Sequence, residues 1–221
     1  MCFLNQLAPL QVAAQVDKPP IHRTFRKKEI DRYSVVIDSE GGNGTAHYEF
    51  ELKLFAERPV AESSDTKVEA TFLNLKSKFN DMVAPNRKLF GSASYKFPET
   101  GFPNDYSLAG QEANFVLPIL SWYLPTSAVE TGHDFTVPEM VFDGTVHVSG
   151  GGILASMDSA SATIKLVLMF NMGNQKSEGS KAQDPSFAST ATFSVKTGVL
   201  ETADGTMAGL GGKMSFHVKK I

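Results

Sequence analysis

Apolar and polar residues alternate with a period of two along most of this chain. The clearest stretch spans residues 47–55. Its apolar positions are Tyr48, Phe50, Leu52 and Leu54, and its polar positions are His47, Glu49, Glu51 and Lys53. This is the pattern of a strand with one buried face and one wet face. It predicts an antiparallel sheet with one solvated side.

The same alternation predicts further strands across the sequence. They are expected at 33–38, 67–75, 91–97, 145–149, 162–170, 190–195 and 213–218. Glycine-containing turn signals separate them, at 41–44, 100–101, 143–144, 150–152, 197–198 and 204–205. Short strands divided in this way favour a meander. The predicted fold class is mainly β, a curved antiparallel sheet or half-barrel.

One unit occurs twice. Residues 93–110 and 191–209 each read as a strand, a Thr-Gly turn and a return strand. The repeat predicts two related β halves, about 20–111 and 126–221, within a single domain at 15–221. A chance likeness between two hairpins is the alternative.

Two segments break the alternation. Residues 112–125 are apolar, and because Pro118 can start a helical turn and Pro125 ends one, they predict a short helical plug between the halves. The plug would close the open end of the sheet or act as a lid over a ligand. Residues 171–189 are polar and rich in Gly and Ser, which predicts a mobile loop.

The net charge and the first residues of the chain limit the classes of partner and the cellular location that we expect. With 21 basic and 24 acidic residues, the net charge of −3 provides no electrostatic footprint for nucleic acid or for anionic lipid. No apolar run reaches the roughly 18 residues of a membrane span. Residues 1–14 end in Ala13 and Ala14, at a spacing that signal peptidase accepts. They predict a truncated signal peptide and therefore an extracytoplasmic location in a bacterium, in the periplasm or cell envelope. The alternative is a frayed N-terminal segment that does not direct export. Cleavage after Ala14 would remove Cys2, which is a lipidation site only if it belongs to a lipobox.

Candidate chemistry is sparse. His47, His147 and His217 are all expected on the polar face, where they could converge with Glu49 or Glu51 into a metal site. No ligand spacing supports this, so neither a metal nor a cofactor is predicted. The adjacent His133 and Asp134 could form a base and its orienting acid, but the sequence lacks a nucleophile motif. Residues 209–213 are glycine-rich and contain a lysine, but they lead into a strand and are expected to form a turn rather than a phosphate loop.

The order of these features resembles that of uncharacterised exported bacterial β-rich proteins. The resemblance rests on the Leu-Pro segment at 117–125, on 129–137 and on the Thr-Gly unit at 191–200. More distantly, the chain is similar to the lipoprotein-carrier half-barrels of the LolA and LppX type. That similarity implies an apolar concavity that holds acyl chains.

The sequence thus favours a non-catalytic, exported structural or interaction protein with a possible protein partner. The first alternative is a carrier or binder of a lipid or other hydrophobic molecule, and the second is a hydrolase that uses His133 and Asp134. The residues predicted to line the ligand face are Phe50, Leu52, Phe115, Leu120, Trp122, Leu166 and Leu168. The sequence leaves open whether this face is a cavity or a filled core.

Overall fold

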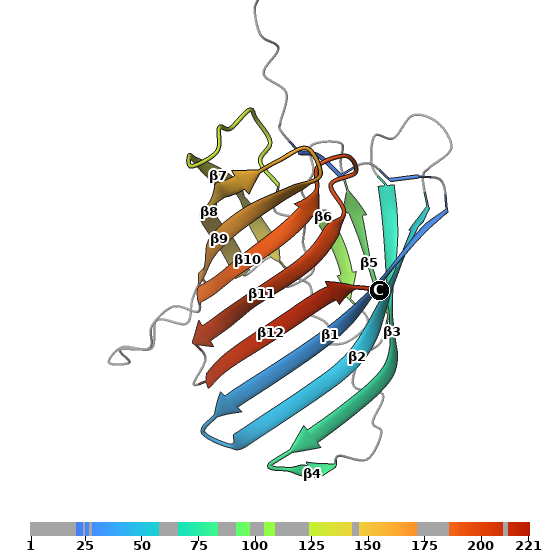
Figure 1. Ribbon diagram of the computed structural model, residues 1–221. Coiled ribbons are helices and arrows are strands. Elements are labelled where there is room, and N and C mark those ends of the chain that lie inside the picture. Colours follow the sequence, from blue (N-terminus) through green and yellow to red (C-terminus); the bar gives the residue numbers. More distant parts are fainter. Residues whose placement is uncertain are drawn as a thin grey trace, which may run out of the picture.

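The computed structural model shows a single curved sheet (Figure 1). It describes residues 21–23, 25–26, 28–57, 66–83, 92–97, 104–108, 124–142, 146–171, 186–209 and 212–221. Within these ranges twelve strands form the sheet, and every paired neighbour is antiparallel. The same ranges contain no helix, and therefore none long and apolar enough to cross a membrane. The predicted fold class is confirmed.

The strands are β1 (Glu29–Gly41), β2 (Gly44–Glu57), β3 (Thr66–Phe79), β4 (Met82–Val83), β5 (Ser92–Phe97), β6 (Asn104–Leu108), β7 (Asp134–Phe142), β8 (Val146–Met157), β9 (Ser161–Asn171), β10 (Ser186–Ser194), β11 (Leu200–Gly209) and β12 (Gly212–Lys220). Their order is β6-β5-β3-β2-β1-β12-β11-β10-β9-β8-β7, and β4 pairs with β3 outside this path. The seam between β1 and β12 joins two runs of consecutive strands. The halves predicted from the repeat therefore lie next to one another in one sheet, and their origin by duplication stays a prediction.

Alternation decides which face of each strand is buried. In β1, Tyr33 and Val35 are fully buried, whereas Ser34 between them is partly exposed. We call the buried side of the sheet the inner face and the opposite side the outer face. The sheet curves so that β5 and β6 pass behind the strands around β12 (Figure 1). The apolar side chains of the inner face form one continuous cluster.

Two glycine segments predicted to be turns lie inside strands, so those predictions were wrong. Residues 150–152 run through the middle of β8, and 204–205 lie within β11. Gly152 is directly opposite Phe135 of β7, and Gly205 is opposite Phe216 of β12. A Cβ at either glycine would collide with the ring of its partner. The glycines therefore make room for aromatic rings that cover the bare backbone of the neighbouring strand.

Other predicted turns and hairpins are confirmed where the structure describes them. The two repeated units contain the antiparallel pairs β5–β6 and β10–β11, and a two-residue turn at 42–43 joins β1 to β2. The turns predicted at 100–101 and 143–144 lie outside the described residues. The predicted loop at 171–189 was wrong at its ends, because Asn171 closes β9 and residues 186–189 begin β10. Most of that loop lies outside the described residues, as do residues 112–123 of the predicted plug and the predicted signal peptide with Cys2.

Candidate functional site: the inner face and its two ends

The inner face is apolar across the breadth of the sheet. Of the residues predicted to line it, Phe50 and Leu52 lie on β2, and Leu166 and Leu168 lie on β9, with exposed fractions of 5% or less. All four belong to the same apolar cluster, although four strands separate β2 from β9. The other predicted lining residues, Phe115, Leu120 and Trp122, lie outside the described residues. The described lining is suited to hydrocarbon rather than to polar groups.

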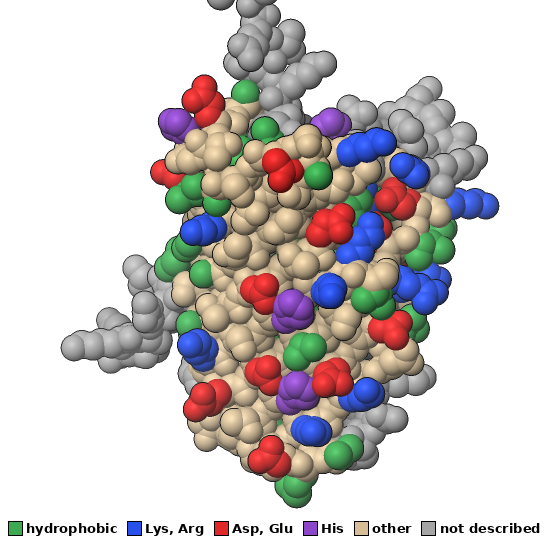
Figure 2. All heavy atoms as spheres, in the orientation of Figure 1, with side chains coloured by type: hydrophobic (Ala, Val, Ile, Leu, Met, Phe, Trp, Pro, Cys, Tyr) green, Lys and Arg blue, Asp and Glu red, His purple; other side chains and the backbone are tan. Residues whose placement is uncertain are grey.

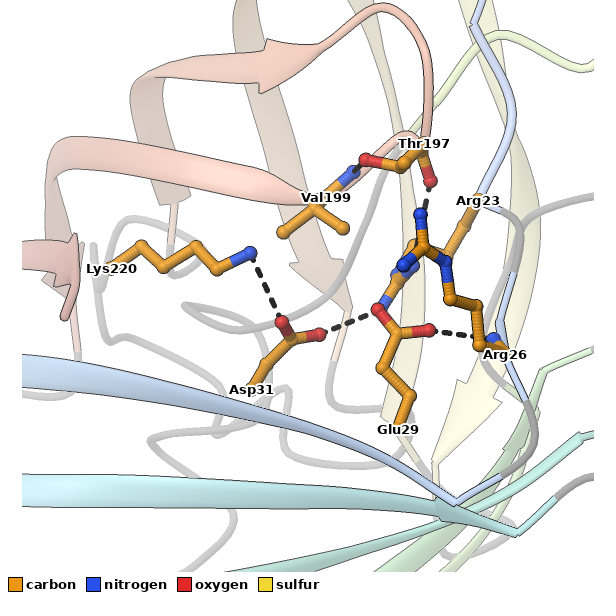
Figure 3. A network of polar contacts seen from close by, with 7 residues as sticks. All are labelled: Arg23, Arg26, Glu29, Asp31, Thr197, Val199 and Lys220. Atoms are coloured by element: carbon orange, nitrogen blue, oxygen red, sulfur yellow. Dashed lines mark hydrogen bonds and ion pairs between the residues drawn. The ribbon is translucent and has the colours of Figure 1, made fainter.

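One end of the inner face is closed by a polar network that the sequence did not predict (Figure 3). Arg23, whose side chain is 1% exposed, donates from Nη2 to Asp31 Oδ2 at 2.7 Å and to Glu29 Oε1 at 3.2 Å. Lys220 Nζ, on the last strand, lies 3.1 Å from Asp31 Oδ1. The guanidinium also lies 3.9 Å from the centre of the Phe25 ring. The network ties the segment before β1 to both strands of the seam.

The Thr-Gly turn between β10 and β11 completes this closed end. Gly198 has a φ of +62°, a left-handed conformation that favours glycine. A Cβ at this position would collide with the backbone of His22 and Arg23. The carbonyl of Thr197 accepts a hydrogen bond from Arg23 Nη1 at 3.4 Å. The repeated turn therefore anchors the N-terminal segment, in which Ile21 is fully buried.

The opposite end of the inner face is open. Along β2, burial falls from Phe50 to the partly exposed Tyr48, and along β12 it falls from Phe216 to the partly exposed Met214. Met207 of β11 is likewise only partly buried against the core. Apolar side chains therefore reach this rim, where they alternate with small polar ones such as Ser39 and Ser77.

The outer face carries the histidines, each beside a carboxylate on a neighbouring strand. His47 Nδ1 lies 2.6 Å from Asp38, His147 Nδ1 lies 2.7 Å from Glu139, and His217 Nδ1 lies 2.7 Å from Asp204. Figure 2 shows histidine and acidic side chains together on this face. The polar-face placement predicted from the sequence is confirmed. The three histidines do not converge, and the described residues contain no group of three or more potential ligands that could hold a metal ion.

His47 is the one strand histidine with two carboxylate partners among the described contacts, because Nε2 also lies 3.2 Å from Glu49. The hydrogen bond to Asp38 raises the pKa of His47 above its ordinary value, and the hydrogen bond to Glu49 raises it further by a smaller amount. The same contact with His47 lowers the pKa of Glu49. An open depression of about 560 Å³ lies beside this cluster, lined largely by polar residues that include Lys78 and Ser215.

His133 and Asp134 do not form the predicted orienting pair among the contacts that the structure describes. The Nδ1 atom of His133 lies 4.0 Å from Glu130 instead, and both side chains are largely exposed. The backbone N–H of His133 donates to the Glu130 carbonyl at 3.0 Å, and Asp134 begins β7. This arrangement is that of a solvated turn at the start of an edge strand.

No protein-family model and no curated protein matches this sequence. Among solved structures, the chain is similar to that of lipovitellin, described in a study of lipid–protein interactions, with a TM-score of 0.55 and 13% identity. The match covers 90% of this chain and 25% of the lipovitellin chain, so the chain spans about a quarter of that protein. A Vibrio parahaemolyticus domain described as an outer membrane lipoprotein-sorting protein matches with 9% identity over 86% of this chain and 85% of its own, but its TM-score of 0.27 supports no statement about fold. The lipovitellin match shows a likeness in fold alone.

Proposed function

We propose that this protein binds a lipid or another hydrophobic molecule on the inner face of its sheet, and that it does so without catalysis. The observation that supports this best is the uneven burial of the inner face. Most of the inner face is buried, and the partly buried Tyr48, Met207 and Met214, which pack against it, extend its apolar lining toward one rim. A ligand that covered these side chains would remove further apolar surface from water.

The fold likeness to lipovitellin agrees with this proposal, because that protein was studied for its lipid–protein interactions. Fold likeness alone is a weak argument for function, so the proposal rests on the lining. We include in the proposal the extracytoplasmic location predicted from residues 1–14. We also include the resemblance to lipoprotein carriers.

Native mass spectrometry of protein purified from its host tests the proposal directly. We expect a species heavier than the polypeptide, with the added mass recovered as lipid after organic extraction. A bare polypeptide mass, with no lipid in the extract, would overturn the proposal and favour the structural or interaction role. Removing the ligand should also lower the Tm, because a ligand that binds only the folded state stabilises it.

A matched pair of variants on β9 locates the ligand. Leu168 is fully buried on the inner face, and its neighbour Val167 is 55% exposed on the outer face. Leu168→Ala should reduce the amount of bound ligand and cost about 2–5 kcal/mol of stability. Val167→Ala removes a similar amount of hydrocarbon from the opposite face, and it should change the amount of bound ligand and the stability only slightly. Equal ligand content in the two variants would contradict binding on the inner face.

A further inference from the structure

The β3–β4 hairpin ends in exposed apolar side chains at the open rim. Phe79 is 44% exposed and Met82 is 69% exposed. They form the pair that flanks the turn at Asn80 and Asp81. Both turn residues have positive φ, 46° and 64°, as in the two-residue turns that match the twist of a hairpin. We call Phe79 and Met82 the apolar lip; a tight turn holds it in place.

Strand register places the lip on the inner face. Ser77, 7% exposed, pairs with Tyr48, and Phe79 pairs with Ala46, two positions further along both strands. Residues two apart on a strand share a face, and directly paired residues share it too. Phe79 and Met82 therefore continue the apolar lining that begins at the core and passes Tyr48.

The two ends of the inner face differ, because one end is closed and the other has exposed apolar side chains. The Arg23 network and the Gly198 turn close one end, where Ile21 is fully buried. The lip stands at the other end with its side chains in solvent. Phe79 and Met82 therefore lie at the end of the inner face that is opposite the Arg23 network.

The outer side of the same hairpin has a different character. Lys76 and Lys78 are exposed there, and Lys76 Nζ lies 3.5 Å from Glu49. Val83 pairs with Lys78 and is 78% exposed. Apolar side chains at a tip with lysines behind them suit a bilayer interface, where hydrocarbon enters the acyl region and ammonium groups meet phosphates. Asp81 in the turn and Glu49 beside Lys76 offset this charge, so we expect the apolar side chains to supply most of the affinity.

We propose that the apolar lip docks on the surface of a lipid bilayer and that an acyl chain passes there between the bilayer and the inner face. This inference rests on the proposed function for the passage of the acyl chain, but docking itself does not require a bound ligand. The expected partner is therefore a lipid surface, not a protein groove or a second copy of the chain.

Flotation of the full chain with vesicles of phosphatidylcholine and phosphatidylglycerol tests docking. Met82→Ser should lower the fraction bound roughly 10-fold, because it removes one large apolar side chain from the bilayer, and Met82→Leu should restore it. Ile30→Ser is the matched control, since Ile30 is 50% exposed on the outer face near the closed end, and it should bind as the wild type does. Met82 is so exposed that its replacement should leave the Tm unchanged.

Transfer of a fluorescent phospholipid from protein to vesicles separates this inference from the proposed function. We expect Met82→Ser to retain the ligand found by native mass spectrometry but to release it to vesicles about 10-fold more slowly. Unchanged flotation and transfer in this variant would overturn the lip as the docking point, even if the protein holds lipid. Loss of a wild-type dimer in the variant, with no vesicle binding by either protein, would identify the lip as a contact between copies and would also overturn the inference.

Discussion

Replacing Asp31 by Asn tests whether the buried network holds the closed end. Asp31 has a side chain 6% exposed and balances Arg23, 1% exposed, and Lys220, 33% exposed. Removing one member of a buried ion pair costs about 3–5 kcal/mol, because the remaining charge loses its compensation. Glu29 stays 3.2 Å from the guanidinium, so we expect the lower part of this range. A loss of about 3 kcal/mol corresponds to a fall in Tm of roughly 6–12 °C for a chain of this size.

Urea unfolding followed by circular dichroism measures this loss. The matched control is Glu69→Gln, because Glu69 and Lys67 form an ion pair of similar length, 2.9 Å, whose side chains are about half exposed. The control should cost less than about 0.5 kcal/mol. Replacing Arg23 and Asp31 together by Met and Leu should recover most of the stability, since no buried charge is then left unpaired between them. Equal costs for Asp31→Asn and Glu69→Gln would refute the reasoning.

Two further predictions concern the turn at the closed end and the outer face. Gly198→Ala should destabilise the protein by at least about 1 kcal/mol, because it combines a left-handed φ with a collision against the N-terminal segment; limited proteolysis should then cut that segment faster, and an unchanged cleavage rate would contradict this account. The raised pKa of His47 means that its interaction with its two carboxylate partners contributes stability below about pH 6.5, the unfolded value, and that this contribution is lost as pH rises through the higher folded value. The difference in urea midpoint between the wild type and His47→Gln should therefore be largest near pH 5 and shrink toward pH 8, and a constant difference would show that protonation plays no part.

The strands and their faces were predictable because alternation records burial directly. The buried Phe50 and Leu52 and the wet His47 and Glu49 were assigned to the correct sides of β2 from the sequence alone. The pairing of a glycine with an aromatic residue on the next strand, as for Gly152 with Phe135, was not predictable in the same way. A glycine that ends a strand and a glycine that makes room for a ring look alike in one sequence, and only the register of the neighbouring strand distinguishes them.

The closed end and the lip were missed for a second reason, which is that neither is local. The network joins Arg23, Asp31 and Lys220, which come from opposite ends of the sequence and meet only because β1 pairs with β12. The lip depends on an irregularity in the pairing of β2 and β3, near Asn74 with its φ of +56°. This shift changes which alternate positions face inward, so simple alternation stops predicting the face before Phe79 is reached.

The seam between β1 and β12 has a consequence for how the chain reaches its fold during synthesis. Tyr33 pairs with Lys220 and Gly41 pairs with Gly212, so the first and last of the described strands are neighbours. As the chain leaves the ribosome, β1 and β2 emerge early, yet one edge of β1 stays open until β12 has been made. Pairings this distant along the chain slow folding, and an open edge beside a bare apolar face invites aggregation in the meantime. Production of this protein should therefore depend on slow translation or on a chaperone that shields the unfinished half of the sheet.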